Sequence, residues 1–167
     1  MKKVEDALKI ILEGAETTAA ERVAITEADG RILAEDILSP VFHPPTDNSA
    51  MDGFAVRWDD VKDASPENPV KLNVLQDIHA GERADLVLGE GEATSIMTGA
   101  PIPPGADTVI RVEDTNRSRG KMIEIYKGGK KGQDIRKKGE NIQKGDAVYE
   151  RGQLIGPAET GMLALMG

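Results

Sequence analysis

The stretch Pro44-Pro-Thr-Asp-Asn-Ser-Ala-Met-Asp-Gly53 is too polar and too rich in turn-forming residues to be part of a core. Pro44 and Pro45 favour an extended backbone, because proline locks its own φ angle and the residue before it avoids helical angles. The aspartate, asparagine and glycine residues that follow are typical of turns. We therefore expect the chain to leave one domain and enter another near Pro44.

The segment before Pro44 begins with a helical pattern. Apolar residues within positions 4–12 recur on one helical face and predict an amphipathic helix that ends near Glu13-Gly14. Residues 31–37 fit either a short helix or a strand, and the pattern leaves both open.

The segment after Gly145 mixes strand and helix signals. Residues 146–149 and 153–155 flank a turn and predict a hairpin. Gly156-Pro157 predicts the start of a final helix, because proline at the first helical position loses no hydrogen bond that the helix would have made.

The middle of the chain has a different character, with short apolar runs separated by glycine and proline. Partial alternation predicts half-buried strands in four segments, at residues 70–75, 91–97, 108–113 and 122–126. The fold class that follows is α+β, with a β-rich domain inserted into a small discontinuous α/β domain. We place the inserted domain at residues 44–144 and the discontinuous domain at residues 1–43 and 145–167.

The composition excludes several classes of protein. The 21 basic and 29 acidic residues give a formal charge of −8, which opposes a general role in binding nucleic acid, and aromatic residues for base stacking are scarce. The sequence has no run of about 18 apolar residues, so we expect a soluble, cytoplasmic protein without a membrane partner. Because the chain has no cysteine, a metal would need oxygen or imidazole ligands.

The opening stretch has two interpretations. It is either a linker turn whose polar side chains satisfy its own backbone, or a stiff loop that presents Asn48, Ser49 and Asp52 to a ligand. In the second case, Asp52 is a candidate Mg²⁺ ligand, because Mg²⁺ usually takes one or two carboxylates together with waters and phosphate oxygens.

Two further segments have the same ambiguity. In 97–105, the Thr98 hydroxyl and the N–H groups of Gly99 and Ala100 fit a small cradle for an anion, and a rigid proline turn is the alternative. In 132–141, Arg136 suits a phosphate because its guanidinium is planar, whereas charge runs are usually solvated surface.

Together these segments resemble the N-terminal part of the molybdopterin molybdenumtransferase family, which includes MoeA and the gephyrin E domain. The resemblance rests on Pro44-Pro-Thr-Asp-Asn-Ser-Ala-Met-Asp-Gly-Phe-Ala-Val-Arg57, on Ile96-Met-Thr-Gly-Ala-Pro-Ile-Pro-Pro-Gly-Ala-Asp-Thr-Val109 and on Asp134-Ile-Arg-Lys-Lys-Gly-Glu-Asn-Ile142. The three motifs occur in the family's order, and the likeness covers essentially the whole chain.

The resemblance implies a role in molybdenum cofactor biosynthesis. Family enzymes insert molybdate, or in some relatives tungstate, into adenylylated molybdopterin with Mg²⁺ and release AMP, and they are homodimers acting on small anionic substrates. By motif, Asp52 and Thr98 resemble the catalytic residues, with Asp52 also the metal ligand. The substrate-binding residues that the resemblance implies are Asn48, Ser49, Gly99, Ala100, Arg136, Glu140 and Asn141.

The sequence departs from the family pattern at two positions. Thr46 stands where phenylalanine is common, and Asn141 stands where an aspartate is usual, so a carboxylate is missing unless Glu140 replaces it. An amide binds a hard cation less strongly than a carboxylate.

The family's substrate-binding domain and C-terminal β domain do not occur in these 167 residues. We therefore expect a fragment that is inactive alone. A non-catalytic dimerisation or scaffolding module is the alternative, whereas a free-standing phosphohydrolase would need a larger carboxylate cluster than the sequence provides.

Overall fold

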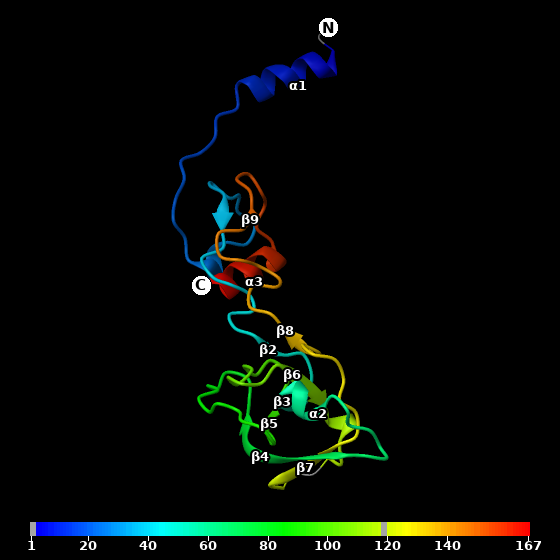
Figure 1. The fold of residues 1–167 in the computed structure, drawn as a ribbon. Coiled ribbons are helices and arrows are strands. Elements are labelled where there is room, and N and C mark those ends of the chain that lie inside the picture. The colour runs from blue at the N-terminus through cyan, green and yellow to red at the C-terminus, as the bar shows by residue number, and fades with distance from the viewer. Residues whose placement is uncertain (1–2, 118–119) are drawn as a thin grey trace. The chain divides into compact units, whose positions relative to one another are not determined.

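The computed structural model describes residues 3–117 and 120–167, and its chain divides into two compact units (Figure 1). Unit 1 contains Met1–Ile37 and Ala147–Gly167, and unit 2 contains Leu38–Asp146. Unit 2 is thus continuous in sequence and interrupts unit 1. Unit 2 begins six residues before and ends two residues after the inserted domain expected at residues 44–144.

Unit 1 combines helices with short paired segments. Its elements are α1 (Val4–Glu13), the 3-10 turn η1 (Ile25–Glu27), β9 (Ala147–Tyr149) and α3 (Pro157–Met166). Strand β1 (Ile37–Leu38), which pairs with β9, ends one residue beyond the boundary of this unit. The buried residues Ala28, Leu33 and Ile155 form its core. The N-terminal and C-terminal parts of the chain therefore share one small core.

Both helices expected in unit 1 are confirmed. The α1 helix ends at Glu13, with Gly14 as its C-cap. The α3 helix starts at Pro157, and the carboxylate of Glu159 accepts the N–H of Gly156 at 3.0 Å, which satisfies one of the donors left free at a helix start.

The hairpin expected at residues 146–155 is wrong. Strand β9 pairs with β1, and the segment after the turn pairs with residues 30–33 instead. Leu33 donates its N–H to Gln153 at 2.9 Å, and Ile155 donates its N–H to Arg31 at 2.8 Å. Residues 32 and 37–38 are therefore extended, which settles the helix-or-strand alternative for that segment in favour of extended backbone.

Unit 2 is built on a mixed five-stranded sheet with the order β6-β3-β5-β4-β7. Only the contact between β4 and β5 is parallel. The strands are β3 (Gly53–Val56), β4 (Val70–Ile78), β5 (Glu92–Ile96), β6 (Thr108–Arg111) and β7 (Met122–Ile125). Four of them confirm the predicted strands. The fifth, β3, follows the polar stretch directly and was not predicted.

Unit 2 also contains several smaller elements. They are the one-turn helix α2 (Trp58–Val61), the 3-10 turn η2 (Val112–Asp114), and the two-stranded pair of β2 (Asn48–Ser49) and β8 (Ile135–Arg136). The apolar residues of the sheet fall into two clusters according to strand alternation. Phe54 and Val56 belong to one cluster and Ala55 to the other, so β3 is buried on both faces. The architecture is α+β, as predicted.

Gly53 shows why the polar stretch must end in glycine. A Cβ atom at this position would lie 2.0 Å from the carbonyl oxygen of Ile110 on the neighbouring strand β6. A glycine there lets β3 approach β6 immediately after Asp52.

We expect Gly53→Ala to lower the free energy of unfolding of unit 2 by about 1–3 kcal/mol, because the added methyl group must displace backbone rather than a flexible side chain. Urea unfolding followed through Trp58, the single tryptophan, measures this. Gly161→Ala, which meets no atom within 4 Å in α3, is the control and leaves the Trp58 transition in place. A Gly53→Ala protein as stable as the wild type would contradict the close approach.

Candidate functional site

The three motifs singled out in the sequence meet within unit 2, around the short strand β2. On one edge, Ser49 donates its N–H to the carbonyl of Ala100 at 2.9 Å and accepts the N–H of Gly99 at 2.8 Å. On the other edge, Asn48 and Ser49 are the Cα partners of Arg136 and Ile135. Segment 47–52 is therefore held between segments 97–102 and 134–137.

Asp52 and Thr98 are in direct contact at this site. The Asp52 Oδ1 atom accepts the backbone N–H of Thr98 at 2.7 Å and its hydroxyl at 2.8 Å, and both residues are exposed. The N–H bond first and the hydroxyl bond second lower the pKa of the Asp52 carboxyl below its ordinary value. The Asp52 carboxylate is therefore held at Oδ1, whereas its Oδ2 atom accepts no hydrogen bond from any of the residues described.

Ser49 shapes the turn that leads to Asp52. Its side chain is fully buried, and its hydroxyl accepts the N–H of Met51 at 3.2 Å while donating to the carbonyl of the same residue. The Ser49 hydroxyl thus stabilises the turn at Met51 from the buried side of the loop and does not face solvent.

The anion cradle expected from Gly99 and Ala100 is not present in the structure. Gly99 donates its N–H to Ser49, and Ala100 donates its N–H to the carbonyl of Met97 at 2.9 Å. Both groups already have backbone partners, so they are not free donors for an anion. A role of these two residues in substrate binding stays a prediction.

Asp47 ties the basic segment to the same loop. Its carboxylate accepts the Lys137 ammonium at 2.8 Å and the N–H of Lys138 at 2.9 Å. The Lys137 bond first, and the Lys138 bond second, lower the pKa of Asp47. Asp47 therefore pairs with the Lys137 cation, whereas it holds Lys138 through the backbone and the Lys138 ammonium lies over the Phe42 ring, 4.4 Å from its centroid.

The remaining predicted residues lie along the same segments. Arg136 is exposed on β8, opposite Asn48. Glu140 and Asn141 are also exposed; the carboxylate of Glu140 accepts the N–H of Lys137 at 2.8 Å, and the N–H of Asn141 bonds to the carbonyl of His43 at 3.0 Å. Asn48 is 9% exposed, and its Oδ1 atom is buried without a partner among the described residues.

The donor set at Asp52 suits a hard divalent cation. A carboxylate and a hydroxyl oxygen are the ligand types that Mg²⁺ prefers, with waters and substrate oxygens completing its shell. The described part of the chain contains no group of three or more histidine, aspartate or glutamate side chains arranged to hold a metal. Any Mg²⁺ bound here would thus depend on ligands beyond Asp52 and Thr98.

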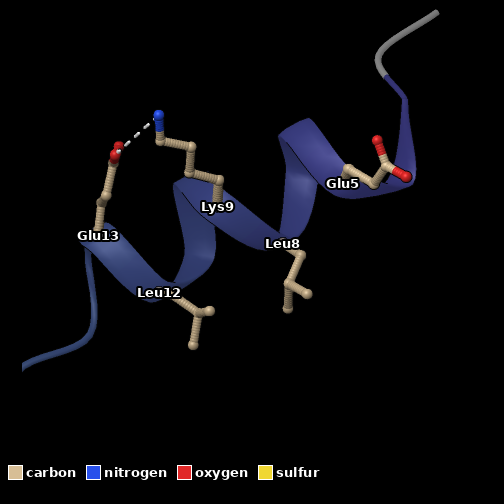
Figure 2. A pocket seen from close by; sticks show the side chains of 5 residues that line it. All are labelled: Glu5, Leu8, Lys9, Leu12 and Glu13. Atoms are coloured by element: carbon tan, nitrogen blue, oxygen red, sulfur yellow. Dashed lines mark ion pairs between the residues drawn. The ribbon is translucent and has the colours of Figure 1, made fainter.

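Two hollows in unit 1 contain none of the predicted site residues. One, of about 420 Å³, is lined only by α1, where Leu8 and Leu12 lie on one side and Lys9 pairs with Glu13 at 3.8 Å (Figure 2). The other, of about 1130 Å³, lies along the extended segment before η1 and is lined by residues such as Thr17, Ile32 and Leu163.

None of the helices described is long and apolar enough to cross a bilayer.

Sequence reasoning missed an ion pair close to Asp52. The Arg111 guanidinium binds both carboxylate oxygens of Asp134, at 2.8 and 3.0 Å. The two residues are 23 positions apart, and neither stands in a local pattern that would signal the contact.

Comparisons with known proteins identify the family of the chain. Residues 2–167 match the family model for the MoeA N-terminal region, described as domains I and II. The chain is 38% identical over 167 residues to molybdopterin molybdenumtransferase 2 of Mycobacterium tuberculosis, covering all of this chain and 41% of that protein. It is 41% identical over 150 residues to the molybdopterin molybdenumtransferase of Synechococcus elongatus, covering 89% of this chain and 37% of that protein.

Solved structures give the same result. Two crystal structures of a molybdopterin biosynthesis MoeA protein from Pyrococcus horikoshii superpose with TM-scores of 0.84 and 0.89, at 41% and 36% identity. Each match covers 98% of this chain, and 41% and 43% of the respective Pyrococcus chains. This chain therefore spans about two fifths of the length of its relatives, and it belongs to the MoeA N-terminal region family of molybdenum cofactor biosynthesis.

Proposed function

We propose that this chain supplies the N-terminal part of an enzyme that inserts molybdate or tungstate into adenylylated molybdopterin and releases AMP. The observation that carries the proposal is the contact between Asp52 and Thr98, which come from separate motifs 46 residues apart. The names of the relatives support the reaction class, since those proteins are molybdopterin molybdenumtransferases.

Thr98 and Asp52 have distinct tasks in this proposal. Thr98 fixes the Asp52 carboxylate through Oδ1, and Oδ2 is the atom that would bind a ligand. Mg²⁺, when bound, supplies the positive charge that lets an anionic oxo species and a substrate phosphate approach a protein of formal charge −8. Arg136 adds an exposed guanidinium on the adjacent strand.

In this proposal, the rest of the reaction site comes from a partner subunit. It also comes from domains like those that make up the other three fifths of the relatives. A cytoplasmic homodimer would bring those parts to the Asp52 loop. Asp52 provides a single protein carboxylate, which suits Mg²⁺ only when substrate oxygens and further ligands complete its coordination.

A scaffolding role is the second candidate, and the surface of α1 favours it. Val4, Leu8 and Ile11 are 85%, 54% and 67% exposed, so an apolar face of this helix is open for association. Such a module would form a tight complex without ligand and without any need for Asp52.

The function is tested by placing residues 1–167 in the matching region of the Mycobacterium tuberculosis transferase and measuring molybdenum insertion into adenylylated molybdopterin with Mg²⁺ and molybdate. We expect the chimera to be active. Asp52→Asn should lower its rate by about 100-fold or more, and Thr98→Val by about tenfold, because charge placement dominates such sites.

Glu67→Gln, at an exposed loop position of unit 2, is the matched control and should leave the rate unchanged. Unfolding curves and molecular mass establish that each chimera is folded and assembled. A folded chimera whose rate does not respond to Asp52→Asn would refute the catalytic proposal and favour the scaffold.

The pKa of Asp52 tests whether the Thr98 hydroxyl acts on the Asp52 carboxyl, independently of turnover. A carboxyl whose folded-state pKa lies below its unfolded value stabilises the fold above the unfolded pKa, and this contribution is lost as the pH falls through the folded pKa. Thr98→Val should raise the pKa of Asp52 only part of the way, because the N–H bond is the larger cause and remains. Thr98→Ser keeps the hydroxyl and should leave the pKa unchanged. Carboxyl ¹³C NMR titration measures both, and an identical pKa in the valine variant would show that the hydroxyl does not act on Asp52.

A further inference from the structure

The ion pair of Arg111 and Asp134 is bidentate and partly buried. Arg111 Nε donates to Asp134 Oδ2 at 2.8 Å and Nη2 donates to Oδ1 at 3.0 Å. The Asp134 side chain is only 11% exposed, while that of Arg111 is 45% exposed. Parallel bonds of this kind fix direction as well as distance, unlike a single contact to a lysine.

The backbones of the two partners lie at opposite ends of the segment that carries Asp52. Arg111 is the Cα partner of Gly53 on β3, and the next residue, Val112, donates its N–H to the carbonyl of Asp52 at 3.1 Å. At the other end, Ala50 donates its N–H to the carbonyl of Asp134 at 2.8 Å. The ion pair therefore closes a loop of contacts around residues 50–53.

The backbone of Asp134 is in an unusual conformation that serves both of its contacts. Its φ of 57° lies in the left-handed region, which is uncommon for residues other than glycine and in which aspartate and asparagine are the most enriched. In this conformation, the carbonyl meets Ala50 while the carboxylate meets Arg111. The Arg111 bond is the largest cause of the lowered pKa of Asp134.

We propose that Arg111 and Asp134 are positioning residues, which brace segment 50–53 so that the Asp52 carboxylate stays in contact with Thr98. They do so by joining β6, which pairs with Gly53, to Asp134, the residue before β8, whose carbonyl accepts the N–H of Ala50. The value of this brace for catalysis rests on the proposed function, but the contact that it maintains is a property of this chain and is measured without turnover.

The test compares two substitutions that both accept a left-handed backbone. Asp134→Gly keeps the carbonyl that binds Ala50 but removes the carboxylate, whereas Asp134→Asn keeps one oxygen acceptor for Arg111. Amide hydrogen exchange of Thr98, whose N–H binds Asp52, is measured by NMR in each protein. We expect exchange at Thr98 to accelerate by about tenfold in Asp134→Gly and by about twofold or less in Asp134→Asn.

Arg111→Ala separates bracing from a direct effect of charge. It removes the cation, whereas Asp134→Gly leaves the cation and removes its partner, so a direct field on the Asp52–Thr98 contact would change with opposite sign in the two variants. Bracing predicts faster exchange at Thr98 in both. Opposite changes would overturn the proposal.

Two controls exclude general destabilisation. The amides of Ala55 and Val56 in β3 should keep their wild-type exchange rates, and equal acceleration there would reduce the pair to an ordinary stabilising contact. Lys71→Ala breaks an ion pair with Glu124 of 3.2 Å on the far side of the sheet, between β4 and β7, and should leave Thr98 unaffected. Unchanged exchange at Thr98 in Asp134→Gly would also refute the brace.

Discussion

The candidate site depends on the backbone hydrogen bonds that segment 47–50 makes on both of its edges. On one side, Ser49 exchanges bonds with Gly99 and Ala100, and on the other, Ala50 binds the carbonyl of Asp134. Each such bond contributes only about 0.5–1.5 kcal/mol, but leaving one of the buried groups unpaired would cost more. This two-sided pairing brings three distant motifs to one place in unit 2.

An exposed carboxylate is difficult to keep in one orientation, because nothing packs against it. Here Asp52 is held at Oδ1 by Thr98, its carbonyl is held by Val112, and the glycine after it lets β3 approach β6 closely. The side chain is therefore accessible without being free to rotate. This is the arrangement needed where a carboxylate must meet a cation and an anionic substrate at defined positions.

Periodicity in the sequence predicted the helices and strands that can be recognised without knowing which segment they pack against. Strands such as β4 and β7 alternate, and α1 and α3 have helical spacing or a clear start, so local chemistry was enough. Local chemistry was not enough for β3, because a glycine after polar residues indicates a turn. Only the structure shows that Gly53 lies in a strand, where a Cβ atom would be 2.0 Å from the carbonyl oxygen of Ile110. The expected hairpin at 146–155 failed because its second half pairs with residues 30–33, a distant partner. Asp52 and Thr98 were found through family resemblance. Asp134 opens the third motif of that resemblance, but neither periodicity nor the motif indicated that it pairs with Arg111.

The hydrogen bond by which Thr98 holds the Asp52 carboxylate should persist in solution. It is tested most directly by a through-hydrogen-bond scalar coupling between the Thr98 amide nitrogen and the Asp52 carboxyl carbon, measured by NMR on the full chain at neutral pH. We expect a resolved coupling between these two nuclei. A chain that is folded, with β3 and β5 amides protected, but that shows no such coupling would contradict it.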